Sequence, residues 1–178
     1  VHEMNDNKVE LKKGLRDVYI DKSESSSIDG KAGKLLYRGY NIDELAVHSN
    51  FEETAYLVMY GKLPTQAQLD EFDATLKAAR LIPDEIVDII KLTRNSHPMD
   101  VLRTAISALS AYDPDTEDNS TEATLRKGLR LTAQAPTIVA THARVRDGKD
   151  PIAPDSNLNQ AANFLNMLFG ELPEKVDS

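Results

Sequence analysis

Hydrophobic positions recur with helical spacing along most of the chain, from Asn41 onward. Apolar residues three and four positions apart, with polar residues between them, are typical of amphipathic α-helices. Asn41 and Asn50 are predicted N-caps, Glu53 completes the pattern of a capping box with Asn50, and Gly61 is a stop signal. Further helices are predicted to begin near Pro64, Pro83, Pro98 and Ser120, and to cover residues 157–169. The pattern predicts a mainly α-helical fold.

Two short β-strands are predicted before the helices, at residues 18–20 and 35–37. The pair Asp29-Gly30 is a turn signal, so this part of the chain is predicted to form a small β-hairpin. Residues 21–27 are rich in serine and charge and are predicted to be a solvated loop, with phosphorylation as a minor alternative. Because two short strands are only marginally stable alone, the hairpin must lie against helices.

The segment around residues 98–112 is predicted to be the central helix. His97 is placed to cap it, Pro98 occupies the first helical position, and Asp100 faces the positive end of the helix dipole. Its apolar residues form two stripes: Leu102, Ile106 and Leu109, and Val101, Ala105, Ala108 and Tyr112. A helix that is apolar on nearly all sides is buried, and small residues permit close approach, so this helix is predicted to pack against a partner chain.

Composition and charge narrow the function classes. The 178 residues are 40% hydrophobic and 28% charged, with a net charge of −8 and an estimated pI of 5.0. An acidic chain argues against binding nucleic acid or an anionic membrane surface. Cysteine is absent, which excludes disulfides and thiolate chemistry. The chain has no apolar run of membrane-spanning length, and its polar first ten residues do not resemble a signal peptide, so a cytoplasmic protein is expected.

Candidate chemistry is sparse. The four histidines, His2, His48, His97 and His142, are scattered without the spacing of metal ligands. Gly30 and Gly33 fit a turn better than a phosphate-binding loop. The adjacent carboxylates Glu52-Glu53 and Asp70-Glu71 point apart on a helix and are interpreted as solvated faces. Residues 113–118 lack the glycine and terminal glutamate of a calcium loop, and residues 119–121 fit a glycosylation acceptor. These residues alone assign no active site.

Four sequence blocks, taken in order, resemble a known family. They are GKLLYRGYNIDELA (33–46), FEETAYLVMYGKLP (51–64), HPMDVLRTAISALSAYD (97–113) and PTIVATHARVRDGKDPIAPDSNLNQAANFLNML (136–168). Together they resemble the N-terminal half of bacterial and archaeal citrate synthases and the closely similar 2-methylcitrate synthases. The resemblance covers residues 14–178, with residues 1–13 expected to be a flexible tail.

The resemblance implies an almost all-α, citrate synthase-like fold with a short N-terminal β-hairpin. It also implies a homodimer built on antiparallel helix pairs, to which helices 84–95 and 98–112 would contribute. The family reaction condenses acetyl-CoA, or propionyl-CoA in 2-methylcitrate synthases, with oxaloacetate. A carboxylate base, two histidines and carboxylate-binding arginines carry that chemistry.

The family's catalytic residues lie in downstream motifs, a His-Gly-Gly segment, a Gly-His-Arg segment and a later aspartate, which this sequence does not contain. No catalytic, cofactor-binding or metal-binding residue is therefore assigned to this chain, His97 included. Acetyl-CoA or propionyl-CoA is expected only as a substrate of the parent enzyme, and no cofactor is expected on this chain.

Three interpretations of the chain remain open. It is an N-terminal fragment of a citrate synthase-type enzyme, incomplete at its C-terminal end, or a helical dimerisation module without activity, or a non-catalytic subunit that pairs with a catalytic chain. The fragment is favoured because Pro173 primes a helix that has few residues left to form. The sequence does not separate citrate synthase from 2-methylcitrate synthase.

Overall fold

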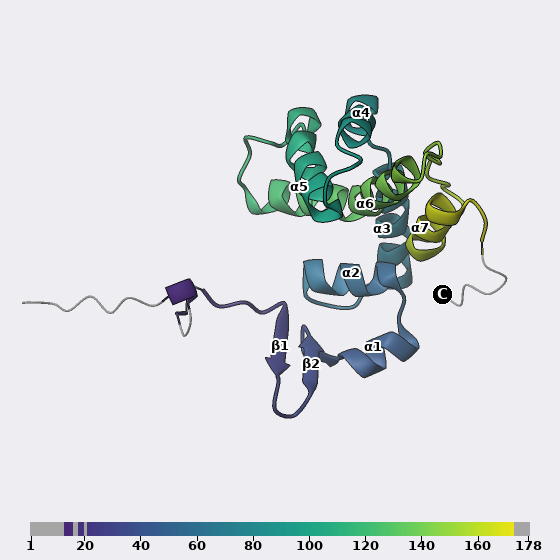
Figure 1. Ribbon diagram of the computed structural model, residues 1–178. Helices are drawn as coiled ribbons and strands as arrows, with labels where there is room; N and C mark the ends of the chain where they lie inside the picture. Colours follow the sequence, from purple (N-terminus) through teal and green to yellow (C-terminus); the bar gives the residue numbers. More distant parts are fainter. Residues whose placement is uncertain (1–12, 16–17, 20, 173–178) are drawn as a thin grey trace, which may run out of the picture.

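The computed structural model describes residues 13–15, 18–19 and 21–172. A small sheet precedes a body of helices (Figure 1). The α-helices are α1 (Ile42–His48), α2 (Phe51–Tyr60), α3 (Gln66–Ala78), α4 (Asp84–Leu92), α5 (Pro98–Leu109), α6 (Thr121–Arg146) and α7 (Gln160–Phe169), with short 3-10 turns at Lys13–Leu15 and Ser110–Tyr112. The prediction of a mainly α-helical fold is confirmed, and the predicted tail lies outside the described residues except for Lys13.

Helix α6 lies at the centre of the helical body, against α3, α4, α5 and α7 (Figure 1). It takes part in two hydrophobic cores. One core joins α4, α5 and α6 through Ile86, Ile90, Val101, Ala105, Leu109 and Ile138. The other joins α2, α3 and α6 through Tyr56, Phe72, Leu76, Leu129 and Ala133. No helix among the described residues has both the length and the apolarity that crossing a membrane requires.

A hairpin with its turn at Asp29-Gly30 is confirmed, but the prediction places its first strand too early in the chain. The sheet has the order β1 (Ser26–Asp29), β2 (Lys34–Tyr37), β3 (Tyr40–Asn41), with antiparallel pairing throughout. Val18 and Tyr19 are not in a strand, and Ile20 lies outside the described residues. The turn decides the pairing, because the Asp29 carboxylate accepts hydrogen bonds from the Lys31 and Ala32 N–H groups and brings Asp29 opposite Lys34.

The predicted helix starts and stops are largely confirmed. The Asn41 and Asn50 side chains cap α1 and α2, and Gly61 ends α2 in the left-handed conformation at φ 82°. The complete capping box lies one helix later than predicted, at the start of α3. There the Thr65 hydroxyl accepts from the Gln68 N–H, while the Gln68 side chain accepts from the Thr65 N–H.

Helix α5 begins as predicted, with the His97 Nδ1 accepting from the Met99 N–H at 3.2 Å. The prediction that it is buried on all sides is wrong. Its buried face carries Val101, Ala105 and Leu109 and packs on α4 and α6. The buried face draws residues from both predicted stripes. Of the others, Leu102 and Ile106 in the first stripe and Ala108 in the second are only half-buried, and Tyr112 in the second is exposed. Arg103, Thr104 and Ser107 face solvent, so this helix docks within the chain mainly through the face that carries Val101, Ala105 and Leu109.

A buried polar network compensates for a proline inside α6. Pro136 has no N–H, so the Thr132 carbonyl loses its partner within the helix. The Gln160 Nε2, at the first position of α7, donates to the carbonyl oxygens of Thr132 at 3.5 Å and Ala133 at 3.3 Å. The Thr137 hydroxyl donates to the Arg80 carbonyl at 2.9 Å. At the predicted interruption, α6 therefore loses only a backbone hydrogen bond next to Pro136, and the helix continues through it.

Arg80 extends this network between α3 and α7. Its side chain is only 1% exposed, with its Nε donating to Gln160 Oε1 at 2.8 Å and its Nη1 donating to the Asp155 and Leu158 carbonyls. Glu52, also buried, accepts from the Gln160 N–H at 2.6 Å. A buried charge is tolerated only when it is hydrogen-bonded and near opposite charge, and the carboxylates of Asp73, Glu52 and Asp155 lie near Arg80.

Replacing Arg80 with methionine should destabilise the chain by about 3 kcal/mol, because Gln160 loses a hydrogen-bond donor and the buried Glu52 loses a nearby positive charge. The change is measured as the free energy of unfolding in urea. Arg103→Ala is the matched control, since the Arg103 side chain is 79% exposed and should contribute less than about 0.5 kcal/mol. Equal unfolding free energies for the Arg80 and Arg103 variants would contradict this role of Arg80.

Candidate functional site

The structure does not bring the histidines together. His97 caps α5, His48 lies in the last turn of α1, and His2 is outside the described residues. His142 is buried, with its Nε2 at 3.1 Å from the Arg94 carbonyl oxygen. No group of three or more His, Cys, Asp or Glu side chains in the described part of the chain is arranged to hold a metal ion.

The two pairs of adjacent carboxylates, Glu52-Glu53 and Asp70-Glu71, differ in how far they are buried. Asp70 and Glu71 are exposed, as predicted. The interpretation of Glu52 as part of a solvated face is wrong, because its carboxylate is buried and accepts from the N-terminus of α7. The sequence carries no local signal for this burial, since the partner lies 108 positions away.

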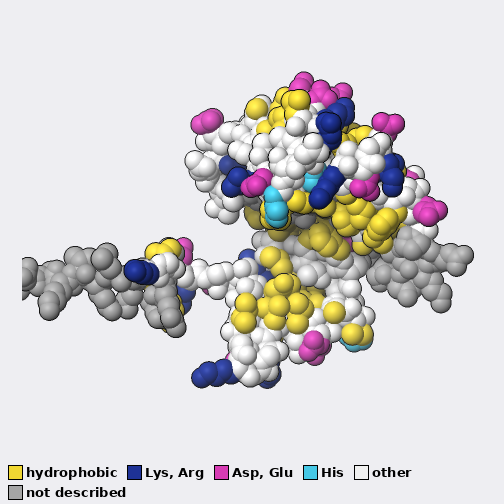
Figure 2. All heavy atoms as spheres, viewed as in Figure 1, with side chains coloured by type: hydrophobic (Ala, Val, Ile, Leu, Met, Phe, Trp, Pro, Cys, Tyr) yellow, Lys and Arg dark blue, Asp and Glu magenta, His cyan; other side chains and the backbone are white. Residues whose placement is uncertain are grey.

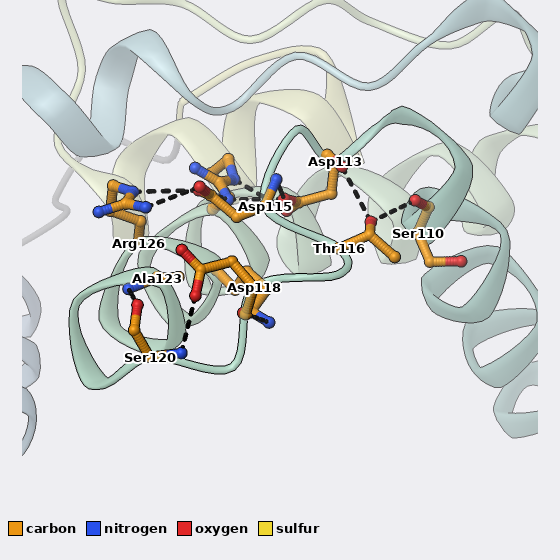
Figure 3. A network of polar contacts seen from close by, with 10 residues as sticks. Ser110, Asp113, Asp115, Thr116, Asp118, Ser120, Ala123 and Arg126 are labelled. Carbon is orange, nitrogen blue, oxygen red and sulfur yellow. Dashed lines mark hydrogen bonds and ion pairs between the residues drawn. The ribbon is translucent and has the colours of Figure 1, made fainter.

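The loop between α5 and α6 contains the densest polar cluster (Figure 3). Arg130 donates from Nε and Nη2 to both Asp113 carboxylate oxygens, at 2.9 and 2.7 Å, and from Nη2 to Asp115 at 2.6 Å. Arg126 binds the same Asp115 carboxylate through two nitrogens, at 3.0 and 2.7 Å. The acidic loop is therefore fastened to the first half of α6 by ion pairs.

The electrostatics of the cluster follow from these contacts. Hydrogen bonds from Arg126 and Arg130 hold the pKa of Asp115 well below its usual range. Burial alone would raise the pKa of Asp113, but hydrogen bonds from Arg130 and from the Asp115 N–H lower that pKa overall. The same pairing raises the pKa of Arg130. Both carboxylates are therefore ionised at neutral pH, and the Arg130 guanidinium is engaged within the chain.

Beside this loop lies a groove of about 500 Å³ between α5, α6 and the segment that connects α3 to α4. Its apolar lining includes Leu81, Ile82, Pro83, Ile106, Leu109 and Leu131, and its polar edge includes Lys127 and Arg130. The Lys127 ammonium donates to the Asp118 carbonyl at 2.7 Å. An apolar floor with both edge cations already engaged favours packing against another polypeptide segment over acid–base chemistry.

A model of the family described as "Citrate synthase, C-terminal domain" matches residues 14–178. The chain belongs to the citrate synthase family. It is 45% identical over 172 residues to citrate synthase of Haloferax volcanii, covering 94% of this chain and 45% of the relative. It is 44% identical over 170 residues to 2-methylcitrate synthase of Mycobacterium tuberculosis, covering 95% of this chain and 43% of the relative.

Solved citrate synthases share the fold. The structure from Pyrobaculum aerophilum matches with a TM-score of 0.86 at 39% identity, covering 90% of this chain and 42% of that one. The structure from Thermotoga maritima matches with a TM-score of 0.78 at 37% identity, covering 93% of this chain and 43% of that one. The resemblance stated from the sequence blocks is confirmed, and the chain spans less than half the length of these relatives.

Replacing Asp115 with asparagine should lower the urea concentration at which the chain unfolds at pH 7, because Arg126 and Arg130 lose a shared carboxylate. A carboxylate with a lowered pKa in the folded state stabilises that state above its unfolded pKa of about 3.9 and loses the effect as the pH falls further. The wild-type and Asp115→Asn midpoints should therefore converge as the pH is lowered from 5 to 2.

Asp147→Asn is the control for this comparison, because Asp147 forms only a long, exposed pair with Lys149 at 3.9 Å. Its unfolding midpoint should follow that of the wild type at every pH. A difference between wild type and Asp115→Asn that persists unchanged at pH 2 would contradict the ionic origin of the effect.

Proposed function

We propose that this chain is the N-terminal scaffold and dimerisation portion of a citrate synthase-type enzyme. The enzyme would condense acetyl-CoA, or propionyl-CoA, with oxaloacetate to citrate, or 2-methylcitrate, and release the thiol of coenzyme A. The observation that carries the proposal is the extended match to solved citrate synthases, with a TM-score of 0.86 over 90% of the chain. The order of the four sequence blocks supports the N-terminal placement, although the matching family model is named for the C-terminal domain.

The described residues support a scaffold role over a catalytic one. His97 caps α5, His142 is hydrogen-bonded to the Arg94 carbonyl, and His48 lies in the last turn of α1. The Arg130 guanidinium is bound to two carboxylates of the same chain. The downstream motifs that carry the family's acid–base groups are not among the 178 residues. Acetyl-CoA and propionyl-CoA are both kept as substrates in this proposal, because the identities to a citrate synthase and to a 2-methylcitrate synthase are nearly equal, at 45% and 44%.

The dimer surface proposed here is the outer face of α4 and α5. Leu92 is 84% exposed and Met99 is 62% exposed, and Leu102 and Ile106 follow Met99 on the same side of α5. The first of these helices ends at Leu92, short of the predicted residue 95. Exposed apolar residues with partly buried neighbours mark a surface that a second copy of the chain would cover. Ala105 lies on the opposite, intrachain face and does not belong to this surface.

Thiol release tests the enzyme proposal. The 178-residue chain alone should release no thiol from acetyl-CoA or propionyl-CoA in the presence of oxaloacetate. The chain joined to the catalytic half of a family relative should release it, whereas that half alone should not. Activity of the isolated chain would contradict the scaffold role, and an inactive but well-folded fusion would favour the alternative of a non-catalytic dimerisation module or subunit.

Replacing Met99 with glutamate should weaken self-association at least tenfold, about 1.4 kcal/mol, because a charge would be buried in an apolar interface. Sedimentation velocity at micromolar concentration measures the change. The control is Val47→Glu on α1, where the native side chain is 74% exposed and away from α4 and α5. A monomeric wild type, or equal association of both variants, would contradict the assignment of this face.

A further inference from the structure

The turn between β2 and β3 holds a non-glycine residue in an unfavourable conformation. Arg38 and Gly39 form a two-residue turn with φ of 48° and 89°. Hairpin turns with positive φ at both positions favour asparagine, aspartate or glycine at the first, because a Cβ atom crowds the backbone there. A strained residue that persists points to a role for its side chain.

The Arg38 side chain reaches across to the end of α2. Its Nε and Nη2 donate to the Val58 carbonyl oxygen at 3.1 and 2.9 Å. Val58 lies in the last turn of α2, where carbonyl groups lack partners within the helix and carry the negative end of its dipole. A guanidinium from the hairpin, 20 positions earlier in the chain, therefore binds the C-terminal end of α2.

The same contact lies beside a groove whose lining includes Tyr37 and Val58. A space of about 520 Å³ separates the hairpin and α1 from α2, with an apolar lining that includes Tyr37, Ile42, Leu45, Ala55, Val58 and Met59. Figure 2 shows hydrophobic side chains gathered at the surface where the hairpin and α2 meet. Opening this groove further would expose apolar area to water and break two hydrogen bonds of a charged group.

We propose that residues 26–48 form a flap over α2, hinged at Ser49 and Asn50, and that Arg38 is the latch that holds it closed. The hinge residues have extended backbone between two helices, with φ of −122° and −112°. Within the flap, α1 packs on β2 and β3, so these elements move as one unit. Release of the latch gives access to the apolar groove while α6 and its two cores stay folded.

Hydrogen exchange of the full 178-residue chain, followed by mass spectrometry, tests the latch in wild type, Arg38→Gly, Arg38→Lys and the control Arg146→Ala. Arg38→Gly removes the side chain and relieves the backbone strain at once. If the latch acts, exchange of residues 34–48 and 55–60 rises roughly tenfold or more, as expected for a lost hydrogen bond to a charged group. Exchange of residues 137–146 stays unchanged. Arg146 is an exposed arginine in the last turn of α6, and its replacement should leave the flap unaffected.

Arg38→Lys keeps the charge and loses the two-nitrogen contact, so it should give a smaller rise confined to the same residues. The proposal is overturned if Arg38→Gly slows exchange in the flap, because relief of strain would then be the whole effect. It is also overturned if Arg38→Lys matches wild type, or if exchange rises equally in α6, which would indicate global destabilisation.

Discussion

The fold depends on keeping a 26-residue helix intact through an internal proline. Helix α6 is the element shared by both hydrophobic cores, so a break at Pro136 would separate them. The Gln160 amide donates to the Thr132 carbonyl, which Pro136 leaves without a partner, and to the neighbouring Ala133 carbonyl. The Thr137 hydroxyl donates to the Arg80 carbonyl, and the Arg80 side chain in turn donates to Gln160. These groups are buried, where an unpaired polar atom costs far more than at the surface, so the network specifies how α3 and α7 meet α6.

The charged cluster at the other end of α6 works differently. Asp113, Asp115, Arg126 and Arg130 lie closer to solvent, and their pairing fastens a loop without filling a core. These arginines are bound by carboxylates of the chain itself, so their guanidinium groups hold the loop against α6. Family membership and the arrangement of the described residues thus lead to the same proposal, a helical framework to which the chemistry is added by other residues.

The sequence predicts what local rules control. Caps at Asn41, Asn50 and His97 and the stop at Gly61 follow from short-range hydrogen bonding, and all are found. The first strand was misplaced because β-branched and aromatic residues at 18–20 outweighed the serines of Ser26–Asp29, whereas the turn at Asp29 decides the pairing. The burial of Glu52 and Arg80 was missed because their partners lie 108 and 80 positions away along the chain. The one indirect signal in the sequence is Pro136, because a proline inside a helix leaves a carbonyl group that needs a hydrogen-bond donor from another part of the chain. The prediction that α5 is buried on all sides is wrong because the apolar content of a helix does not reveal how many neighbours it has.

The most direct test of the central role of α6 is amide hydrogen exchange of the wild-type chain, resolved residue by residue with NMR spectroscopy. Amides of Thr137–His142, which follow the proline, should be among the slowest to exchange and should match those around Leu129, because one continuous helix opens only with the whole structure. Fast exchange after Pro136, with protection retained before it, would show that α6 is two separate helices and would contradict this account.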